Sequence, residues 1–502
     1  MIAAMPVRGL AVALALATGP LLAGGTPAAF AEEGAAPALR ALLSAVTEHR
    51  GRFGGESIRY RAEVAENFVP GADGKPAGAV VTISYLRRDA DAATRPVTFL
   101  FNGGPGASTT PFHFDFFGPR RRLGEGDEQW MVENADSPLD ATDLVFIDPV
   151  GTGYSRPLAG SDGAQFWSRT SDAASVAQVI KDWLRGHGRE GSPRYLAGQS
   201  YGTVRAATML ANAADLEFDG VLLFALVGNA EGSEMPQVVS LPTMAAIAWY
   251  HGRIERGGRS VEQAFDEAVE FARGEYVTAL IKGASLPPEE RRAVAARMAA
   301  LTGLPAEFIE KRRLRVSKED FYLNLLKDQG LRTGQLDGRA TARLDAPPQR
   351  PPYDDPGISY TPDPPPPAPM KARTAGSEDS ALERYFRQEL RFQSPERYIA
   401  LNLDVNQAWK PEGAWGEGTP FQSTEAIAAA MQARPKLRLF WVTGLYDLST
   451  PAYSGRYALD RAGVPADRLT AVQLPGGHSV YKDKANRRAL ADAVRRFVTA
   501  AR

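Results

Sequence analysis

A serine that stands between two glycines is the first candidate for chemistry in this 502-residue chain. Residues 198–202 read Gly-Gln-Ser-Tyr-Gly, follow a short apolar run and precede a segment of helical character. Glycines on both sides of such a turn let the strand and the helix approach closely while the serine hydroxyl stays exposed. The pattern predicts that Ser200 is a nucleophile, although an ordinary strand-to-helix turn would explain these five residues equally well on their own.

A serine nucleophile needs a histidine base and a carboxylate that orients the base, which in this arrangement follow in the order serine, acid, histidine. The chain has five histidines, and only His478 follows a strand that can supply the acid. Asp447 and His478 each come directly after an apolar run. Both are therefore expected at the carboxyl ends of parallel strands, at the edge that presents Ser200. The three placements together predict a catalytic triad.

Residues 102–108, Asn-Gly-Gly-Pro-Gly-Ala-Ser, follow another apolar run. The three glycines among them leave the main chain uncovered by side chains. Glycines allow main-chain N–H groups to approach a substrate oxygen, so the N–H groups of Gly104 and Tyr201 are predicted to form an oxyanion hole. A tight turn is the alternative reading of these glycines. A phosphate-binding loop is disfavoured because no Lys-Ser or Lys-Thr pair follows.

The elements that must position these residues are short apolar runs separated by helical patterns. The runs lie at residues 97–101, 144–147, 195–197, 221–227, 437–442 and 469–474. Continuous apolar strands that alternate with helices predict an α/β fold, with a mostly parallel central sheet covered by helices on both faces. Alternating segments at 57–64 and 80–87 predict an antiparallel hairpin that opens the sheet, and a polar helix is expected over residues 37–50.

An inserted unit is predicted at residues 231–411, because the spacing between the strands on either side far exceeds what a crossover needs. Residues 32–230 and 412–502 then form one catalytic domain. Apolar residues at helical spacing predict that the insert is a mainly helical cap above the strand ends. Residues 347–370 are rich in proline and are expected to be an extended surface segment.

Residues 1–31 have a weakly basic start, an apolar run and Ala-Phe-Ala before Glu32, which predicts a secretory signal peptide. A membrane anchor is disfavoured because the run is short and broken by Gly-Pro. The chain has no cysteine and no Asn-x-Ser/Thr sequon, so we expect a bacterial protein, periplasmic or secreted, that is free of the membrane after cleavage. A formal net charge of -1 gives no reason to expect nucleic acid. Monomer and homodimer both stay open.

Five blocks of the chain occur in the order of the signature blocks of the serine carboxypeptidase family, and the chain resembles that family over about residues 57–253 and 398–498. The blocks are residues 102–108, residues 148–155, residues 198–202, the Asp447 loop and the Gly477-His478 pair. The resemblance implies an α/β-hydrolase fold with an inserted cap and no metal or other cofactor. It also implies that peptide substrates lose C-terminal residues through an acyl-enzyme.

By the same resemblance, Asn102, Gly103 and Gln199 occupy positions that bind the terminal carboxylate of the substrate. The family usually has glutamate where this chain has Gln199, and the carboxyl partner of that glutamate aligns with Phe116, beside Asp115. This departure bears on carboxypeptidase specificity rather than on the hydrolase chemistry. The alternatives are an esterase or acyltransferase that uses the same site and, from a different class, a non-catalytic binding protein of the same fold.

Overall fold

The structure is a computed structural model that describes residues 40–124, 129–228, 230, 232–346, 354–363, 380–410 and 421–500. The predicted signal peptide lies outside the described residues, as does most of the predicted proline-rich segment. The chain divides into two compact units, residues 1–41 and 42–502, and all described helices and strands belong to the second.

A ten-stranded sheet forms the centre of the second unit, with its main strands in the order β1-β2-β3-β7-β4-β9-β10-β13-β14. Strands β1, β2, β3 and β7 pair antiparallel, and the short β8 pairs with β3. Every pair from β7 through β4 to β14 is parallel. The strand bounds are β1 (Ser44–Phe53), β2 (Glu56–Pro70), β3 (Pro76–Arg87), β4 (Val97–Phe101), β7 (Asp143–Asp148), β8 (Arg156–Pro157), β9 (Arg194–Gln199), β10 (Gly220–Phe224), β13 (Arg438–Gly444) and β14 (Leu469–Leu474).

The mostly parallel sheet and the opening hairpin of β2 and β3 are confirmed, but the helix expected over residues 37–50 is wrong in its described part. Residues 44–53 form strand β1, which pairs with β2 in continuous antiparallel register. Gly54 and Gly55, with φ of 57° and 88°, make the tight turn between the two strands. A two-glycine turn favours a hairpin, and side chains along β1 alternate in exposure with the period of a strand.

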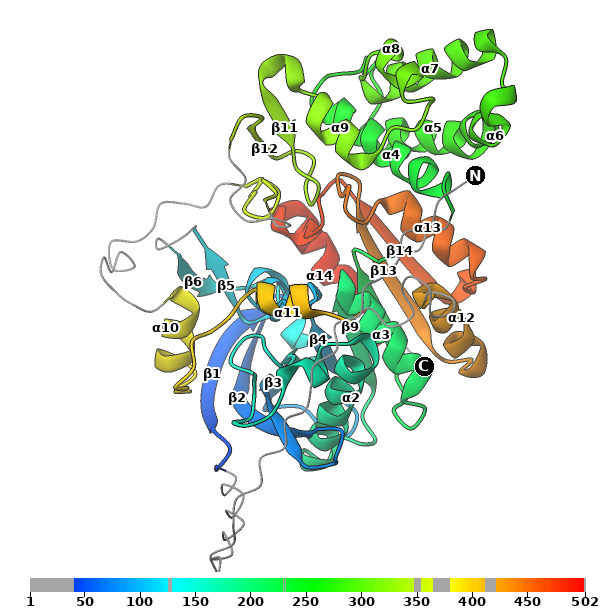
Figure 1. Cartoon of the computed structure of the whole chain (residues 1–502). Helices are drawn as coiled ribbons and strands as arrows, with labels where there is room; N and C mark the ends of the chain where they lie inside the picture. The colour runs from blue at the N-terminus through cyan, green and yellow to red at the C-terminus, as the bar shows by residue number, and fades with distance from the viewer. Residues whose placement is uncertain are drawn as a thin grey trace, which may run out of the picture. The chain divides into compact units, whose positions relative to one another are not determined.

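Helices cover both faces of the sheet (Figure 1). On one face, α2 (Arg169–Gly186), α3 (Tyr201–Asn212) and α12 (Ser423–Ala433) contribute to a core with Phe99 and Leu196. On the other face, the core around Leu100 and Ala197 includes α14 (Lys484–Thr499), α10 (Ala381–Gln388) and the phenylalanine-rich segment of α1 (Thr110–Phe112) and η1 (His113–Phe117). Adjacent residues of one strand thus enter opposite cores, as the pleat requires.

The insert begins with a helical bundle that has its own core. The bundle contains α4 (Met235–Tyr250), α5 (Val261–Phe271), α6 (Val277–Lys282), α7 (Pro288–Thr302), α8 (Ala306–Lys311) and α9 (Lys318–Asn324). A hairpin of β11 (Leu331–Thr333) and β12 (Thr341–Arg343) follows. The bundle core includes Leu445, Tyr446 and Leu448 from the loop after β13, so the insert is packed on the carboxyl edge of the sheet.

The later part of the insert returns to the sheet domain. Helix α10 packs in a sheet-face core rather than in the bundle, and Leu401, before α11 (Leu403–Ala408), forms a bridge to Ala107. The remaining strands and α-helix of the described fold are β5 (Arg120–Leu123), β6 (Trp130–Glu133) and α13 (Ala452–Arg461), and several short 3-10 and π-helical turns lie between the longer elements. Strands β5 and β6 form a separate antiparallel pair.

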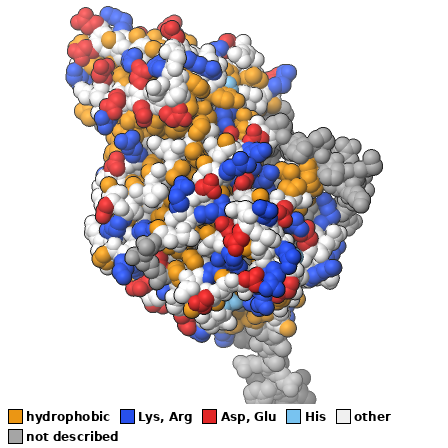
Figure 2. All heavy atoms as spheres, turned by 180° about the vertical axis from the view of Figure 1, so that it is seen from behind, with side chains coloured by type: hydrophobic (Ala, Val, Ile, Leu, Met, Phe, Trp, Pro, Cys, Tyr) orange, Lys and Arg blue, Asp and Glu red, His pale blue; other side chains and the backbone are white. Residues whose placement is uncertain are grey.

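The surface carries charges of both signs. Figure 2 shows Lys and Arg side chains intermingled with Asp and Glu over the face that it presents. This agrees with the formal net charge of -1. Within the described part of the chain, no helix combines the length and the apolar character needed to cross a bilayer.

Candidate active site

Ser200 lies at the junction of β9 and α3 in a strained backbone conformation, with φ 56° and ψ -127°. Such a conformation costs a non-glycine residue about 1–3 kcal/mol and is kept only where the surroundings impose it. A Cβ atom on Gly198 would lie 2.4 Å from the carbonyl oxygen of Gly202, and one on Gly202 would lie 3.0 Å from that of Asn102. The turn therefore requires glycine at position 198 and leaves little room for a side chain at position 202. The N–H of Ser200 donates to the carbonyl of Phe224 at 3.0 Å, which ties the turn to β10.

Asp447 and His478, from the loops after β13 and β14, are in direct contact: Nδ1 of His478 lies 2.7 Å from Oδ2 of Asp447. The Asp447 side chain is fully buried. Its Oδ1 accepts the N–H groups of Ser449 and Thr450 at 3.0 Å each, and its Oδ2 also accepts the Thr450 hydroxyl. A proton on Nδ1 that bonds Asp447 leaves Nε2 of His478 as the lone-pair nitrogen, the form that a general base needs.

The hydroxyl of Ser200 makes no hydrogen bond with any residue in the described part of the chain, His478 included. Catalytic hydrogen bonds are often long in a site without substrate and tighten only in the complex. The structure thus places Ser200 at the end of β9, two strands from β13, and pairs Asp447 with His478, whereas Ser200 and His478 are not in hydrogen-bond contact.

The glycine-rich loop after β4 lies against the turn that carries Ser200. A Cβ atom on Gly103 would approach the backbone nitrogen of Tyr201 to 2.5 Å, so only glycine fits there. Gly104 has φ of 99°, which also favours glycine. Within the described residues, the N–H groups of Gly104 and Tyr201 have no hydrogen-bond acceptor. Both are free to donate to a ligand oxygen.

Gln199 is buried and makes four hydrogen bonds to its surroundings. Its Nε2 donates to the carbonyl of His478 at 3.0 Å and to the hydroxyl of Ser479 at 3.1 Å. Its Oε1 accepts from Nδ2 of Asn102 at 2.8 Å and from the hydroxyl of Tyr481 at 2.6 Å. Both amide hydrogens are thus used within the protein, and the side chain joins β9, which leads to Ser200, to the loop of His478.

Comparison with known families agrees with the resemblance in the sequence. A family model described as serine carboxypeptidase matches residues 85–278. Two curated relatives from Arabidopsis thaliana match shorter stretches: serine carboxypeptidase-like 36 is 32% identical over 132 residues, 25% of this chain and 26% of that protein, and serine carboxypeptidase-like 29 is 29% identical over 113 residues, 22% and 23% respectively. The matches span about a quarter of the length of these relatives.

The α/β-hydrolase fold predicted from the sequence is confirmed. The structure resembles that of Kex1(delta)p, a prohormone-processing carboxypeptidase from Saccharomyces cerevisiae, with a TM-score of 0.52. The likeness covers 87% of this chain and 90% of the yeast chain at 14% sequence identity. At that identity the likeness concerns the fold alone.

The serine carboxypeptidase match contains part of the predicted site. Ser200 and Gln199 lie within residues 85–278, as does the glycine-rich loop, whereas Asp447 and His478 lie beyond that range. Asp447 and His478 are therefore brought together by the fold and by their own contact, outside the range of the family match.

The departure from the serine carboxypeptidase pattern beside Gln199 has a structural counterpart. The ring of Phe116 stacks on that of Tyr481, with centroids 5.3 Å apart and an interplanar angle of 6°. The Tyr481 hydroxyl occupies the hydrogen-bonding position next to Gln199. Asp115 instead forms an ion pair with Arg122 at 3.2 Å. A tyrosine, held by an aromatic stack, is thus the partner of the amide.

A buried ion pair contacts the start of the glycine-rich loop. Arg205 of α3 pairs with Asp172 of α2 at 2.7 Å, and both side chains are almost fully buried. Arg205 also donates to the carbonyl of Asn102 at 2.5 Å. Burial raises the pKa of Asp172 above its usual value, against the opposing effect of Arg205. The pair fixes the start of the loop relative to α3.

Sequence reasoning missed Tyr481, Thr450 and Leu336, whose carbonyl accepts the N–H of His478 at 2.6 Å. The Thr450 contact had a signal, because an aspartate followed by serine and threonine favours local side-chain bonds to the backbone. Tyr481 stands only three residues after the base, yet no motif marks it. Leu336 comes from the insert, and nothing in its sequence predicts the contact.

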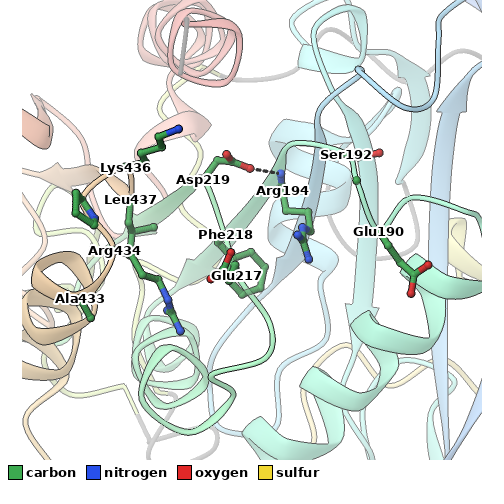
Figure 3. A pocket seen from close by; sticks show the side chains of 12 residues that line it. Glu190, Ser192, Arg194, Glu217, Phe218, Asp219, Ala433, Arg434, Lys436 and Leu437 are labelled. Atoms are coloured by element: carbon green, nitrogen blue, oxygen red, sulfur yellow. Dashed lines mark hydrogen bonds between the residues drawn. The ribbon is translucent and has the colours of Figure 1, made fainter.

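A separate hollow of about 500 Å³ lies at the opposite, amino edge of the sheet (Figure 3). It is lined by Arg194 at the start of β9, Asp219 just before β10 and Leu437 just before β13. Acidic and basic side chains are mixed in it, and Asp219 accepts the N–H of Arg194 at 2.8 Å. Because Ser200 follows the other end of β9, this hollow is not part of the candidate active site.

Proposed function

We propose that the protein is an exported serine-type carboxypeptidase that releases C-terminal residues from peptides through an acyl-enzyme. The observation that carries the proposal is the contact of buried Asp447 with His478 at the sheet edge where Ser200 is held in its strained turn. The N–H groups of Tyr201 at this turn and of Gly104 in the neighbouring loop have no acceptor within the described residues, which supports an acyl-transfer reaction there.

In this mechanism the hydroxyl of Ser200 attacks the carbonyl carbon of the last peptide bond while Nε2 of His478 takes the hydroxyl proton. Asp447 holds the imidazole in the required tautomer and stabilises the imidazolium. The negative charge that forms on the carbonyl oxygen is bound by the N–H groups of Gly104 and Tyr201. His478 then gives its proton to the leaving amine, and water repeats the sequence on the acyl-enzyme.

The resemblance to the serine carboxypeptidase family assigns recognition of the terminal carboxylate to Asn102, Gly103 and Gln199. The amide hydrogens of Gln199 are already bonded to the loop of His478, and Nδ2 of Asn102 is bonded to Gln199. We therefore infer that the main-chain N–H groups of the loop contribute more to this recognition than the Gln199 side chain does.

An esterase or acyltransferase on the same site is the second candidate. It is favoured by the neutral and fully bonded state of Gln199, which supplies no charge for a substrate carboxylate. Such an enzyme would use Ser200, Asp447 and His478 in the same roles and would accept substrates without a free carboxyl group.

Hydrolysis of an N-blocked dipeptide, compared with the same dipeptide amidated at its C-terminus, tests the proposal. We expect the free acid to be cleaved with a much higher kcat/KM than the amide, and the Ser200→Ala variant to cleave neither. Equal rates on both compounds would reject the carboxypeptidase, and rapid cleavage of a simple ester alone would favour the second candidate.

A further inference from the structure

The loop that joins β11 to β12 brings the insert into contact with both loops that carry the acid and the base (Figure 1). Residues 335–339 make these contacts and are called the tether loop below. The carbonyl of Gly338 in this loop lies 2.8 Å from Nε2 of His251, which follows α4 of the bundle. The tether loop is therefore fixed to the body of the insert.

The tether loop binds the loop of Asp447 through its backbone. The carbonyl of Gln335 accepts the N–H groups of Leu448 and Ser449 at 2.8 and 3.0 Å, and the N–H of Gly338 donates to the carbonyl of Tyr446 at 2.9 Å. These bonds flank Asp447 on both sides in the sequence. The position of the acid thus depends on a segment of the insert.

The same loop binds the base. The carbonyl of Leu336 accepts the N–H of His478 at 2.6 Å, while the carbonyl of His478 accepts from Gln199 on the opposite side. A Cβ atom on Gly477 would lie 2.4 Å from Oδ2 of Asp337, so the tether loop and the base loop are in close contact. The main chain of His478 is held between the insert and the nucleophile strand.

Arg339 anchors the tether loop to the sheet domain. Its guanidinium bonds both oxygens of Asp337 at 2.8 and 2.9 Å and both oxygens of Asp483 at 3.0 Å. Asp483 is the residue before α14. The side chains of Arg339 and Asp337 are 7% and 8% exposed, so solvent screens this network weakly. The guanidinium also lies 5.0 Å from the ring centroid of Tyr446.

We propose that Arg339 is a positioning residue of the active site, which holds the tether loop against both triad loops and so fixes the separation of Asp447 and His478. This inference rests on the proposed function. The rival explanation is that the network only attaches the insert. In our account the insert is a working part of the triad, because without it the N–H groups of His478 and Leu448 lose their acceptors, and that of Ser449 keeps only Asp447.

The test compares Arg339→Met and Arg339→Lys with Arg343→Met in the full chain. Arg343 lies on the adjacent strand β12 and pairs with Asp345 at the surface, with side chains 76% and 68% exposed, so it is the matched control. For Arg339→Met we expect kcat to fall by about 10- to 100-fold with KM nearly unchanged, since a shift of about 1 Å at a reacting group can cost about 100-fold. Lysine keeps the charge but cannot bond two carboxylates with a planar fork, so Arg339→Lys should fall between Arg339→Met and the wild type.

The second readout is the NMR resonance of the Nδ1 proton shared by His478 and Asp447. It should broaden or vanish in Arg339→Met and stay unchanged in Arg343→Met. A folded Arg339→Met protein with wild-type kcat and an intact resonance would overturn the inference. If Arg339→Met does not fold, Arg339→Lys decides, and a wild-type kcat and resonance there would overturn it equally. Inactivity of the wild type itself would instead reject the proposed function.

Discussion

Nε2 of Gln199 donates to the main-chain carbonyl of His478 at 3.0 Å, so the residue before Ser200 holds the backbone of His478. In the family that the sequence resembles, this position is expected to bind the carboxylate of the substrate. In this protein the amide has no hydrogen left for a ligand, because its second N–H donates to Ser479. Gln199 therefore connects the strand before Ser200 to the loop of His478, and if these residues act as proposed its substitution should act on kcat more than on KM.

We predict that Gln199→Glu makes activity depend on pH in the alkaline range. The introduced carboxyl must be protonated to donate to the His478 carbonyl, and its ionised form would repel that oxygen. As pH rises the proton leaves, so kcat/KM should fall relative to the wild type. In the wild type, Tyr481 is the titratable side chain bonded to the amide of Gln199. Burial raises the pKa of Tyr481 above its usual value, so this contact adds no group that loses a proton in the tested range.

The check is kcat/KM measured from about pH 6 to 9, below the usual pKa of tyrosine near 10. Gln199→Met is the matched control, because it has similar length and no titratable group, and it should lose the same fraction of activity at each pH. Parallel profiles for Gln199→Glu and Gln199→Met would contradict the assigned bond to the His478 carbonyl.

Asp172→Asn should strongly destabilise the fold. The substitution leaves the Arg205 guanidinium buried without its carboxylate, a loss worth about 3–5 kcal/mol in the free energy of unfolding. Asp182→Asn on the same helix is the control. Its partner Arg185 is 68% exposed, and surface pairs contribute about 0–1 kcal/mol. Urea unfolding of the three proteins measures the difference, and equal midpoints for the two variants would refute the role of the buried pair.

His113 should make the protein less stable in mild acid. It is 1% exposed, its ring lies between those of Phe114 and Phe146 with centroids 3.8 and 4.1 Å away, and burial holds its pKa well below the usual value. Below about pH 6.5 the unfolded chain binds a proton that the folded chain does not. The free energy of unfolding then falls by up to about 1.4 kcal/mol per pH unit from this residue.

The measurement is the free energy of unfolding of the wild type and of His113→Phe between about pH 7.5 and 5, on either side of the usual histidine pKa. Phenylalanine keeps the aromatic stack and cannot titrate, and Tyr85 retains its bond to Tyr385 at 2.9 Å. The variant should lose less stability on acidification than the wild type does. An identical pH slope in both proteins would show that another group causes the acid sensitivity.

The sequence was sufficient for the sheet and for the residue types of the site. Strands such as β4 and β9 are mostly apolar and almost entirely buried, which indicates a sheet covered on both faces, and the two glycines flank Ser200 where the turn brings the backbones close together. Strand β1 was misjudged because its side chains are polar, while the decisive signal was the Gly54-Gly55 turn that returns it onto β2.

The contacts that hold the site together could not be predicted. Leu336 reaches His478 through its main-chain carbonyl, which every residue possesses, so the side chain carries no information about the contact. Tyr481 meets Gln199 only because the loop after β14 turns back over the nucleophile strand. Such pairings depend on tertiary geometry rather than on local pattern.

The central claim is that Ser200, activated by His478 and Asp447, is the nucleophile, and covalent labelling with an alkyl fluorophosphonate tests it most directly. Peptide mass spectrometry of the labelled protein should find one adduct, on Ser200. His478→Ala should label slower by about 10⁴-fold, because the members of a triad act together. Ser200→Ala should not label at all. An adduct on another residue, or undiminished labelling of His478→Ala, would contradict the account.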